Sequence, residues 1–229
     1  MDLPKTLHGQ LYLLAYDPYR RRYELKQLWL LGFALRAAML TDLYLSGYLH
    51  DAHGLARPAG AARPADPMLR SMFEMVGDGE PRTWPWLVAA EQEHAPRLVR
   101  EHLEDRGWLC QVRYRRLGLF PTTRTRPFDE ELTAGLVDRA STALEDAGAG
   151  RTTDPRSLAL GRIASLGLLT SVYYAESHAL AVAAVADLAI PPISGLEAAI
   201  SEVRAATSAV GGCGGCGGGG CGGCGGCGG

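Results

Sequence analysis

Residues 24–45 carry apolar side chains at the spacing of an α-helix for about six turns, and this periodic stretch constrains the fold most. Gly47 follows it, and glycine commonly ends a helix just past its last turn. A long helix with one apolar stripe indicates a packed helical domain. The stripe consists of Leu28, Leu31, Leu35, Met39 and Leu43.

Other parts of the chain also show helical spacing, and strand signals are few. The stretch 158–174 is apolar nearly all round, which predicts a helix at the centre of the core. Residues 50–66 are rich in Gly, Pro, Ala and His and are expected to be a loop. Further helices are expected over residues 7–15, 67–76, 84–92, 96–107, 129–146, 154–174, 177–188 and 194–206.

One segment alternates as a strand does. Over residues 108–123, Val112 and Tyr114 alternate with Arg113 and Arg115, which predicts a β-hairpin. The fold class is therefore mainly α: a single helical domain over residues 1–210 with a hairpin near residues 108–124.

Residues 211–229 contain only Gly and Cys, and a segment with nothing to bury is expected to be disordered. Its thiols include two Cys-x-x-Cys pairs, a spacing that suits Zn²⁺ or Cu⁺. A low-complexity repeat that holds no metal explains the same pattern, and so does a segment that is enzymatically modified. The candidate ligands are Cys213, Cys216, Cys221, Cys224 and Cys227.

The formal net charge of −2 argues against a protein that coats nucleic acid by charge alone. The start of the chain lacks the pattern of a signal peptide, and the apolar run 163–175 is too short to span a bilayer. Cys110 is the one cysteine before the tail, so no disulfide framework is expected. These features predict a cytoplasmic protein whose contact with a membrane is peripheral.

Catalytic motifs are lacking in the sequence. It contains no nucleophile elbow, phosphate loop or paired-carboxylate motif, so we do not expect an enzyme. His50 and His53 have the spacing of two metal ligands without an evident third. The remaining histidines are isolated on predicted helices, where packed or capping roles are commoner: His8, His94, His102 and His178.

Several segments in order resemble the Golgi phosphoprotein 3 family. They are LYLLAYD at 11–17, LRAAMLTDL at 35–43, LEDRGWL at 103–109, LFPTT at 119–123, and DPR at 154–156 with the apolar helix behind it. The resemblance covers most of residues 6–206. It implies a helical domain on the cytosolic face of Golgi membranes, which binds phosphatidylinositol 4-phosphate and gathers the tails of glycosyltransferases.

The resemblance also implies a headgroup site, made of a Trp and an Arg on one helix and two basic residues on the helix before the hairpin. Arg36 matches the family's Arg. At the other three family positions this chain has Gln27, Glu93 and Pro96. The nearest residues of the required type complete the candidate site: Trp29, Arg97 and Arg100.

The hairpin combines guanidinium groups with an apolar tip. Such a tip can enter the acyl region while the arginines hold headgroups, each worth about 1 kcal/mol near an anionic surface. Alternatively, the tip packs on the body or on a second copy of the chain, and the resemblance implies that the hairpin takes part in oligomers. The tip residues are Leu117, Leu119 and Phe120; Arg113, Arg115 and Arg116 precede them, and Arg124 and Arg126 follow.

The expected partners are an anionic membrane lipid, a membrane-protein client and a second copy of the chain. A winged-helix DNA-binding module, with the hairpin as its wing, is the second hypothesis. It needs a basic recognition helix. The predicted helix 67–76 contains one Arg, and the predicted helix 84–92 contains none. A slightly acidic chain therefore favours the membrane, and nucleic acid is not an expected partner.

Overall fold

The computed structural model describes residues 2–17, 20–23, 28–116, 120–167, 169 and 190–211. Its helices are α1 (Leu7–Leu14), α2 (Leu28–Leu45), α3 (Pro67–Gly77), α4 (Trp84–Ala89), α5 (Ala95–Asp105), α6 (Glu130–Gly148), α7 (Pro155–Leu166) and α10 (Pro191–Gly211). Its strands are β1 (Tyr16–Asp17), β2 (Arg22–Tyr23), β3 (Leu49–Ala52), β4 (Leu55–Pro58), β5 (Arg82–Thr83), β6 (Leu109–Arg116) and β7 (Phe120–Pro127). The predicted class, mainly α with a hairpin, is confirmed. No helix in these ranges is long and apolar enough to cross a bilayer.

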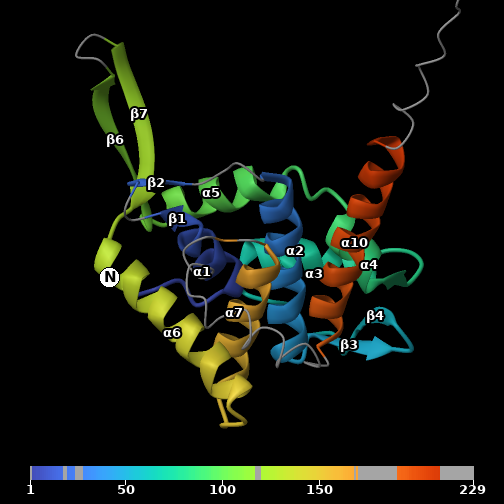
Figure 1. Cartoon of the computed structure of the whole chain (residues 1–229). Helices are drawn as coiled ribbons and strands as arrows, with labels where there is room; N and C mark the ends of the chain where they lie inside the picture. Colours follow the sequence, from blue (N-terminus) through green and yellow to red (C-terminus); the bar gives the residue numbers. More distant parts are fainter. Residues whose placement is uncertain are drawn as a thin grey trace, which may run out of the picture.

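Helix α2 lies at the centre of the molecule, and α1, α3, α4, α5, α7 and α10 pack against it, while α6 packs on α7 and α1 (Figure 1). Every residue from Leu30 to Leu43 is buried, so α2 is enclosed on all sides and presents more than the single predicted stripe. Helix α7 is similarly enclosed over residues 158–165, as its apolar sequence indicated. The apolar sequence beyond α7 and the expected helix over 177–188 lie outside the described residues.

Aspartates set the starts of several helices. The Asp66 carboxylate accepts from the amides of Met68 and Leu69 at the start of α3, and Asp154 accepts from Ser157 at the start of α7. A proline follows each of these aspartates, where its missing N–H costs no helical hydrogen bond. These local signals explain why the sequence predicted both helices.

The expected loop over residues 50–66 is found over residues 59–66 but is a wrong prediction over 50–58, where β3 and β4 form a hairpin that β5 extends to three strands. His53 and Gly54 make its two-residue turn, and both have positive φ, 57° and 83°. Such turns match the twist of a hairpin but normally have Asn or Asp before the Gly. His53 therefore concealed the turn signal.

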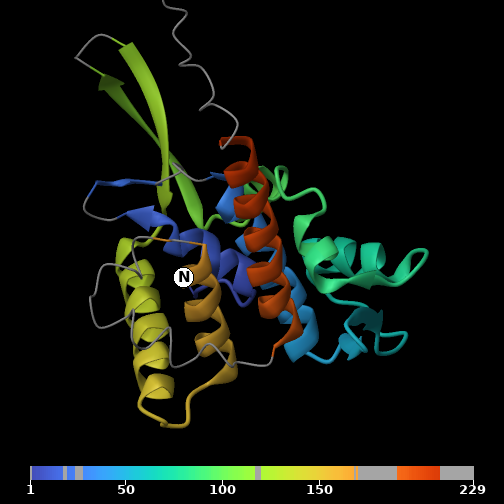
Figure 2. The same cartoon turned by 45° about the vertical axis from the view of Figure 1, so that its right-hand side comes forward.

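The second hairpin is confirmed, and its second strand continues to Pro127, beyond the predicted end at Thr123. β6 and β7 pair antiparallel from Leu109 opposite Pro127 to Arg116 opposite Phe120. Figures 1 and 2 show this ribbon standing away from the helices, on the same side of the molecule as the last turns of α10. A surface at this side is therefore built from segments far apart in the sequence.

Candidate functional site

Trp29 and Arg36 lie on the same face of α2, because seven residues are close to two helical turns. The Trp29 side chain is 38 % exposed, and its ring packs edge-on against Phe33 with centroids 6.0 Å apart. Arg36, by contrast, is only 5 % exposed. One helix face therefore presents an accessible aromatic ring and a covered cation.

Arg36 is held by uncharged acceptors. Its Nε donates to the Leu87 carbonyl at 2.9 Å, and a terminal nitrogen lies 3.0 Å from Met75 Sδ and 3.7 Å from Met72 Sδ. Burial lowers the pKa of Arg36 to about 10, so the side chain stays protonated at neutral pH. None of the ion pairs among the described residues includes it. A buried cation without a bonded carboxylate is costly, and an anion would stabilise it.

The connection between α4 and α5 covers this face of α2. A Cβ at Gly32, between Trp29 and Arg36 on α2, would stand 2.1 Å from the Gln92 carbonyl oxygen, so only glycine lets the connection approach so closely. The neighbours of Gln92 are Glu91 and Glu93, whose charges raise the pKa of Arg36 against the effect of burial. The negative charge near Arg36 thus comes from the connection between α4 and α5, whose carboxylates do not bond directly to the guanidinium.

Arg97 and Arg100 lie exposed on α5, which packs against α1 and α2. Arg97 Nη1 is 3.1 Å from Glu101, and Arg100 Nε is 3.9 Å from Glu104. No hydrogen bond, ion pair or ring contact in the described ranges joins any two of the four candidate headgroup residues. The structure thus places Arg36 in the interior, and Arg97 and Arg100 on the surface with carboxylate neighbours.

The hairpin carries exposed arginines at Arg113, Arg124 and Arg126. Arg124 stands opposite Val112 across the strands, and Arg126 Nη1 lies 3.9 Å from Glu130. Arg115 and Arg116 stand at the outer end of β6, opposite Pro121 and Phe120. The tip residues Leu117 and Leu119 lie outside the described residues, as do the five tail cysteines, so lipid insertion and metal binding there stay predictions.

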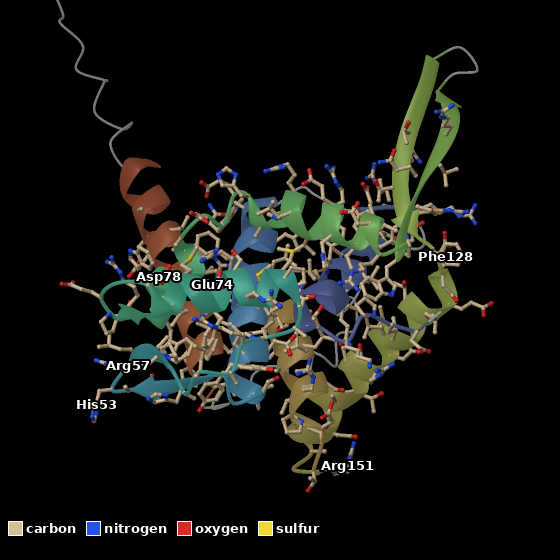
Figure 3. The ribbon with its side chains drawn as sticks, turned by 180° about the vertical axis from the view of Figure 1, so that it is seen from behind. His53, Arg57, Glu74, Asp78, Phe128 and Arg151 are labelled. Carbon is tan, nitrogen blue, oxygen red and sulfur yellow. The ribbon has the colours of Figure 1, made fainter. Side chains whose placement is uncertain are left out.

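An exposed apolar side chain that the sequence analysis missed lies at the base of the hairpin. Phe128 is 64 % exposed and points away from the body beside the first turn of α6 (Figure 3). It lines a shallow hollow together with Trp108 and Leu132. Exposed apolar patches of this kind mark contacts with proteins or membranes. A lone Phe before a helix gave no signal of this exposure.

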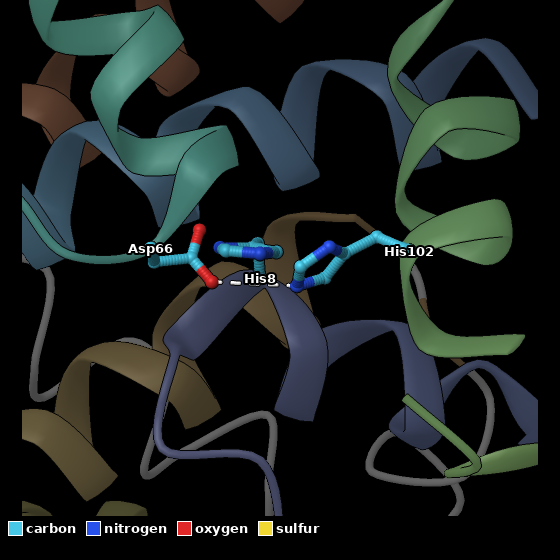
Figure 4. Close-up of side chains that lie close together, drawn as sticks. All are labelled: His8, Asp66 and His102. Atoms are coloured by element: carbon cyan, nitrogen blue, oxygen red, sulfur yellow. Dashed lines mark ion pairs between the residues drawn. The ribbon is translucent and has the colours of Figure 1, made fainter. Parts of the chain in front are cut away.

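Two histidines expected to be isolated lie together in the structure. His8 on α1 and His102 on α5 meet Asp66, the capping residue of α3 (Figure 4). His102 Nε2 lies 3.3 Å from Asp66 Oδ2, and the two imidazole centroids are 6.3 Å apart. Burial lowers the pKa of His8 to about 4, a shift that nearby Asp66 opposes and His102 reinforces. The prediction of isolation is wrong for this pair, because no local motif links residues so distant in sequence.

The other histidines considered as metal ligands do not gather in this way. His50 and His53 lie on β3 and its turn, and Asp51 between them accepts from the Trp84 indole at 2.6 Å and from the Gly54 amide. In the part of the chain that the structure describes, the grouping of metal-ligand residues is the one at His8, Asp66 and His102.

A comparison with known protein families gives one match. The family model for Golgi phosphoprotein 3 (GPP34) matches residues 7–209. The match runs from the first residue of α1 into the last turn of α10, and it includes the projecting hairpin and Arg36. No curated protein sequence matches the chain.

Proposed function

The chain belongs to the Golgi phosphoprotein 3 family, and from this we propose that it is a peripheral membrane protein that binds anionic phospholipid through its hairpin side. The observation that carries the proposal is the β6–β7 ribbon, which stands away from the helices with Arg113 and Arg124 exposed on it. Each arginine near an anionic surface contributes about 1 kcal/mol. Several arginines on one ribbon supply enough attraction to hold the protein at an anionic membrane.

The headgroup we propose is a phosphoinositide, by family phosphatidylinositol 4-phosphate, on the inner face of a membrane. Arg97 and Arg100 are accessible cations on α5, and their carboxylate partners Glu101 and Glu104 are 46 % and 23 % exposed. Because an ion pair at the surface contributes little, a phosphate can replace Glu101 beside Arg97 at small cost. Arg36 would contribute only when the connection containing Glu91 and Glu93 moves. An adaptor role for a membrane-protein client follows from the family alone.

The direct test is flotation with liposomes of stated composition. Reversing Arg113→Glu together with Arg124→Glu is expected to weaken binding to anionic liposomes at least about thirtyfold, because two contributions of about 1 kcal/mol are lost and repulsion is added. Wild-type binding should also weaken as salt rises, since charges near the surface are screened.

A matched control reverses two arginines at the other end of the molecule. Arg57 and Arg151 are exposed and lie far from the hairpin (Figure 3). Arg57→Glu with Arg151→Glu changes the net charge equally and should alter binding less than about threefold. If both double variants lost the same amount of liposome binding, the effect would come from net charge and not from the hairpin. No flotation on any anionic lipid, together with salt-sensitive binding of duplex DNA, would favour the winged-helix hypothesis instead.

Arg36→Met tests whether Arg36 binds a specific headgroup, as distinct from general attraction of the protein to an anionic membrane. The substitution removes a buried charge and keeps an unbranched apolar side chain, so stability is expected to stay unchanged or rise by up to about 2 kcal/mol. Any preference for phosphoinositide liposomes over phosphatidylserine liposomes should disappear, while binding to the latter persists. Urea denaturation and flotation measure the two effects. An undiminished phosphoinositide preference would leave Arg36 with a structural role only.

A further inference from the structure

The His8, Asp66 and His102 side chains come from three separate helical segments and converge at one point. Their potential ligand atoms all lie within 4.8 Å of one another. His102 Nε2 and Asp66 Oδ2 are already 3.3 Å apart, and Figure 4 shows the His8 ring beside this pair. Two imidazoles and one carboxylate are the ligand types that Zn²⁺ takes in proteins.

His8 gives an independent reason to look for a ligand here. Its side chain is fully buried, and its Nδ1 has no hydrogen-bond partner within the described ranges. Its other ring nitrogen has only a long contact, 3.4 Å, with the Thr6 hydroxyl. Buried polar atoms are nearly always paired, so an unpaired imidazole nitrogen beside a carboxylate and a second imidazole calls for a partner.

We propose that His8, Asp66 and His102 form a binding site for a zinc-type divalent metal ion, with a fourth position open to solvent. Ligand atoms around tetrahedral Zn²⁺, at bond lengths of about 2.0–2.1 Å, stand about 3.4 Å apart. The His102–Asp66 pair already has this separation. The His8 nitrogen, now within 4.8 Å of the other two ligand atoms, has to approach them to about 3.4 Å. Asp66 and His102 are 17 % and 14 % exposed, which gives the ion a way in.

The site would fasten α5 to α1 and to the first turn of α3. Helix α5 carries Arg97 and Arg100 and leads within a few residues into β6, so the ion would also fix the base of the hairpin. Asp66 would serve both ends of this arrangement, since its Oδ1 caps α3 while its Oδ2 faces His102. The inference concerns the ion alone and does not require that the protein bind lipid.

The test uses the full chain with its five tail cysteines replaced by serine, so that thiolates there cannot take the ion. After removal of metal, this protein is titrated with Zn²⁺, and with Co²⁺ as a spectroscopic probe. One equivalent is expected to bind, without a thiolate charge-transfer band in the Co²⁺ spectrum. The Tm should rise by about 5–10 °C when free Zn²⁺ reaches a hundredfold excess over its Kd.

Two substitutions remove one ligand each without disturbing the core. Asp66→Asn keeps the helix cap, because Asn caps as well as Asp, and His102→Gln changes a half-buried side chain. Each should weaken Zn²⁺ binding at least about tenfold and abolish the rise in Tm. His94→Gln, at an exposed histidine on the start of α5, should bind as the parent protein does. Circular dichroism melts verify the fold of each variant.

Binding in both ligand variants equal to that of the parent would overturn the proposal, and so would a parent protein that binds no Zn²⁺ at one equivalent. Should one ligand variant fail to fold, the other decides. In either overturning case, the three residues form a polar cluster between α1, α3 and α5 and nothing more.

Discussion

Gly32→Ala is expected to lower the free energy of unfolding by about 2–4 kcal/mol, although Ala is the better helix former. The new Cβ would stand 2.1 Å from the Gln92 carbonyl oxygen, a backbone atom that cannot rotate away. Either α2 or the connection before α5 has to shift. Because that connection also covers Arg36, the shift should loosen the enclosure of the cation as well. Urea denaturation followed by circular dichroism measures the change.

Gly135→Ala provides the matched control with the opposite sign. Gly135 is exposed within α6, and a Cβ there meets nothing within 4 Å. The same chemical change should therefore raise the free energy of unfolding by about 0.5–1 kcal/mol through helix propensity. A loss of stability at Gly135, or none at Gly32, would contradict the packing described between α2 and Gln92.

Asp42→Ala is expected to cost about 2–4 kcal/mol, because one buried carboxylate joins three helices. Its Oδ2 accepts from the Leu7 amide at 2.7 Å, at the start of α1, where Thr6 supplies no side-chain cap. Its Oδ1 lies 2.6 Å from Arg156 Nη1 on α7. Without the carboxylate, the first amide of α1 is buried with no acceptor.

Asp42→Asn should cost less than Asp42→Ala, since the amide oxygen still accepts from Leu7. Burial raises the pKa of Asp42 in spite of the hydrogen bond and ion pair with Arg156. With the folded pKa above the unfolded one, ionisation of Asp42 lowers stability as pH rises through the raised value, and Asn removes this dependence. Asp138→Ala, at an exposed position on α6, should stay within about 0.5 kcal/mol of wild type. Equal stability of Asp42→Ala and Asp138→Ala would contradict the role assigned to Asp42.

Local sequence signals determined most of the secondary structure. Asp66 before Pro67 and Asp154 before Pro155 start two helices, and the alternation around Val112 predicted the hairpin. Segments that resemble Golgi phosphoprotein 3, in the same order along the chain, predicted the family. The family model confirms this prediction. These signals work because caps, periodicity and strand alternation depend on residues only a few positions apart.

Tertiary packing alone decided the state of the candidate sites. Arg36 was identified from sequence as a headgroup residue, but its burial comes from Gln92 packing on Gly32 and from Leu87 reaching its guanidinium. His8 and His102 have no motif in common, and only the packing of α1 and α5 brings them to Asp66. The burial of Arg36 and the geometry of the histidine cluster depend on which surfaces of distant elements pack together. The sequence pattern within one element does not determine that packing.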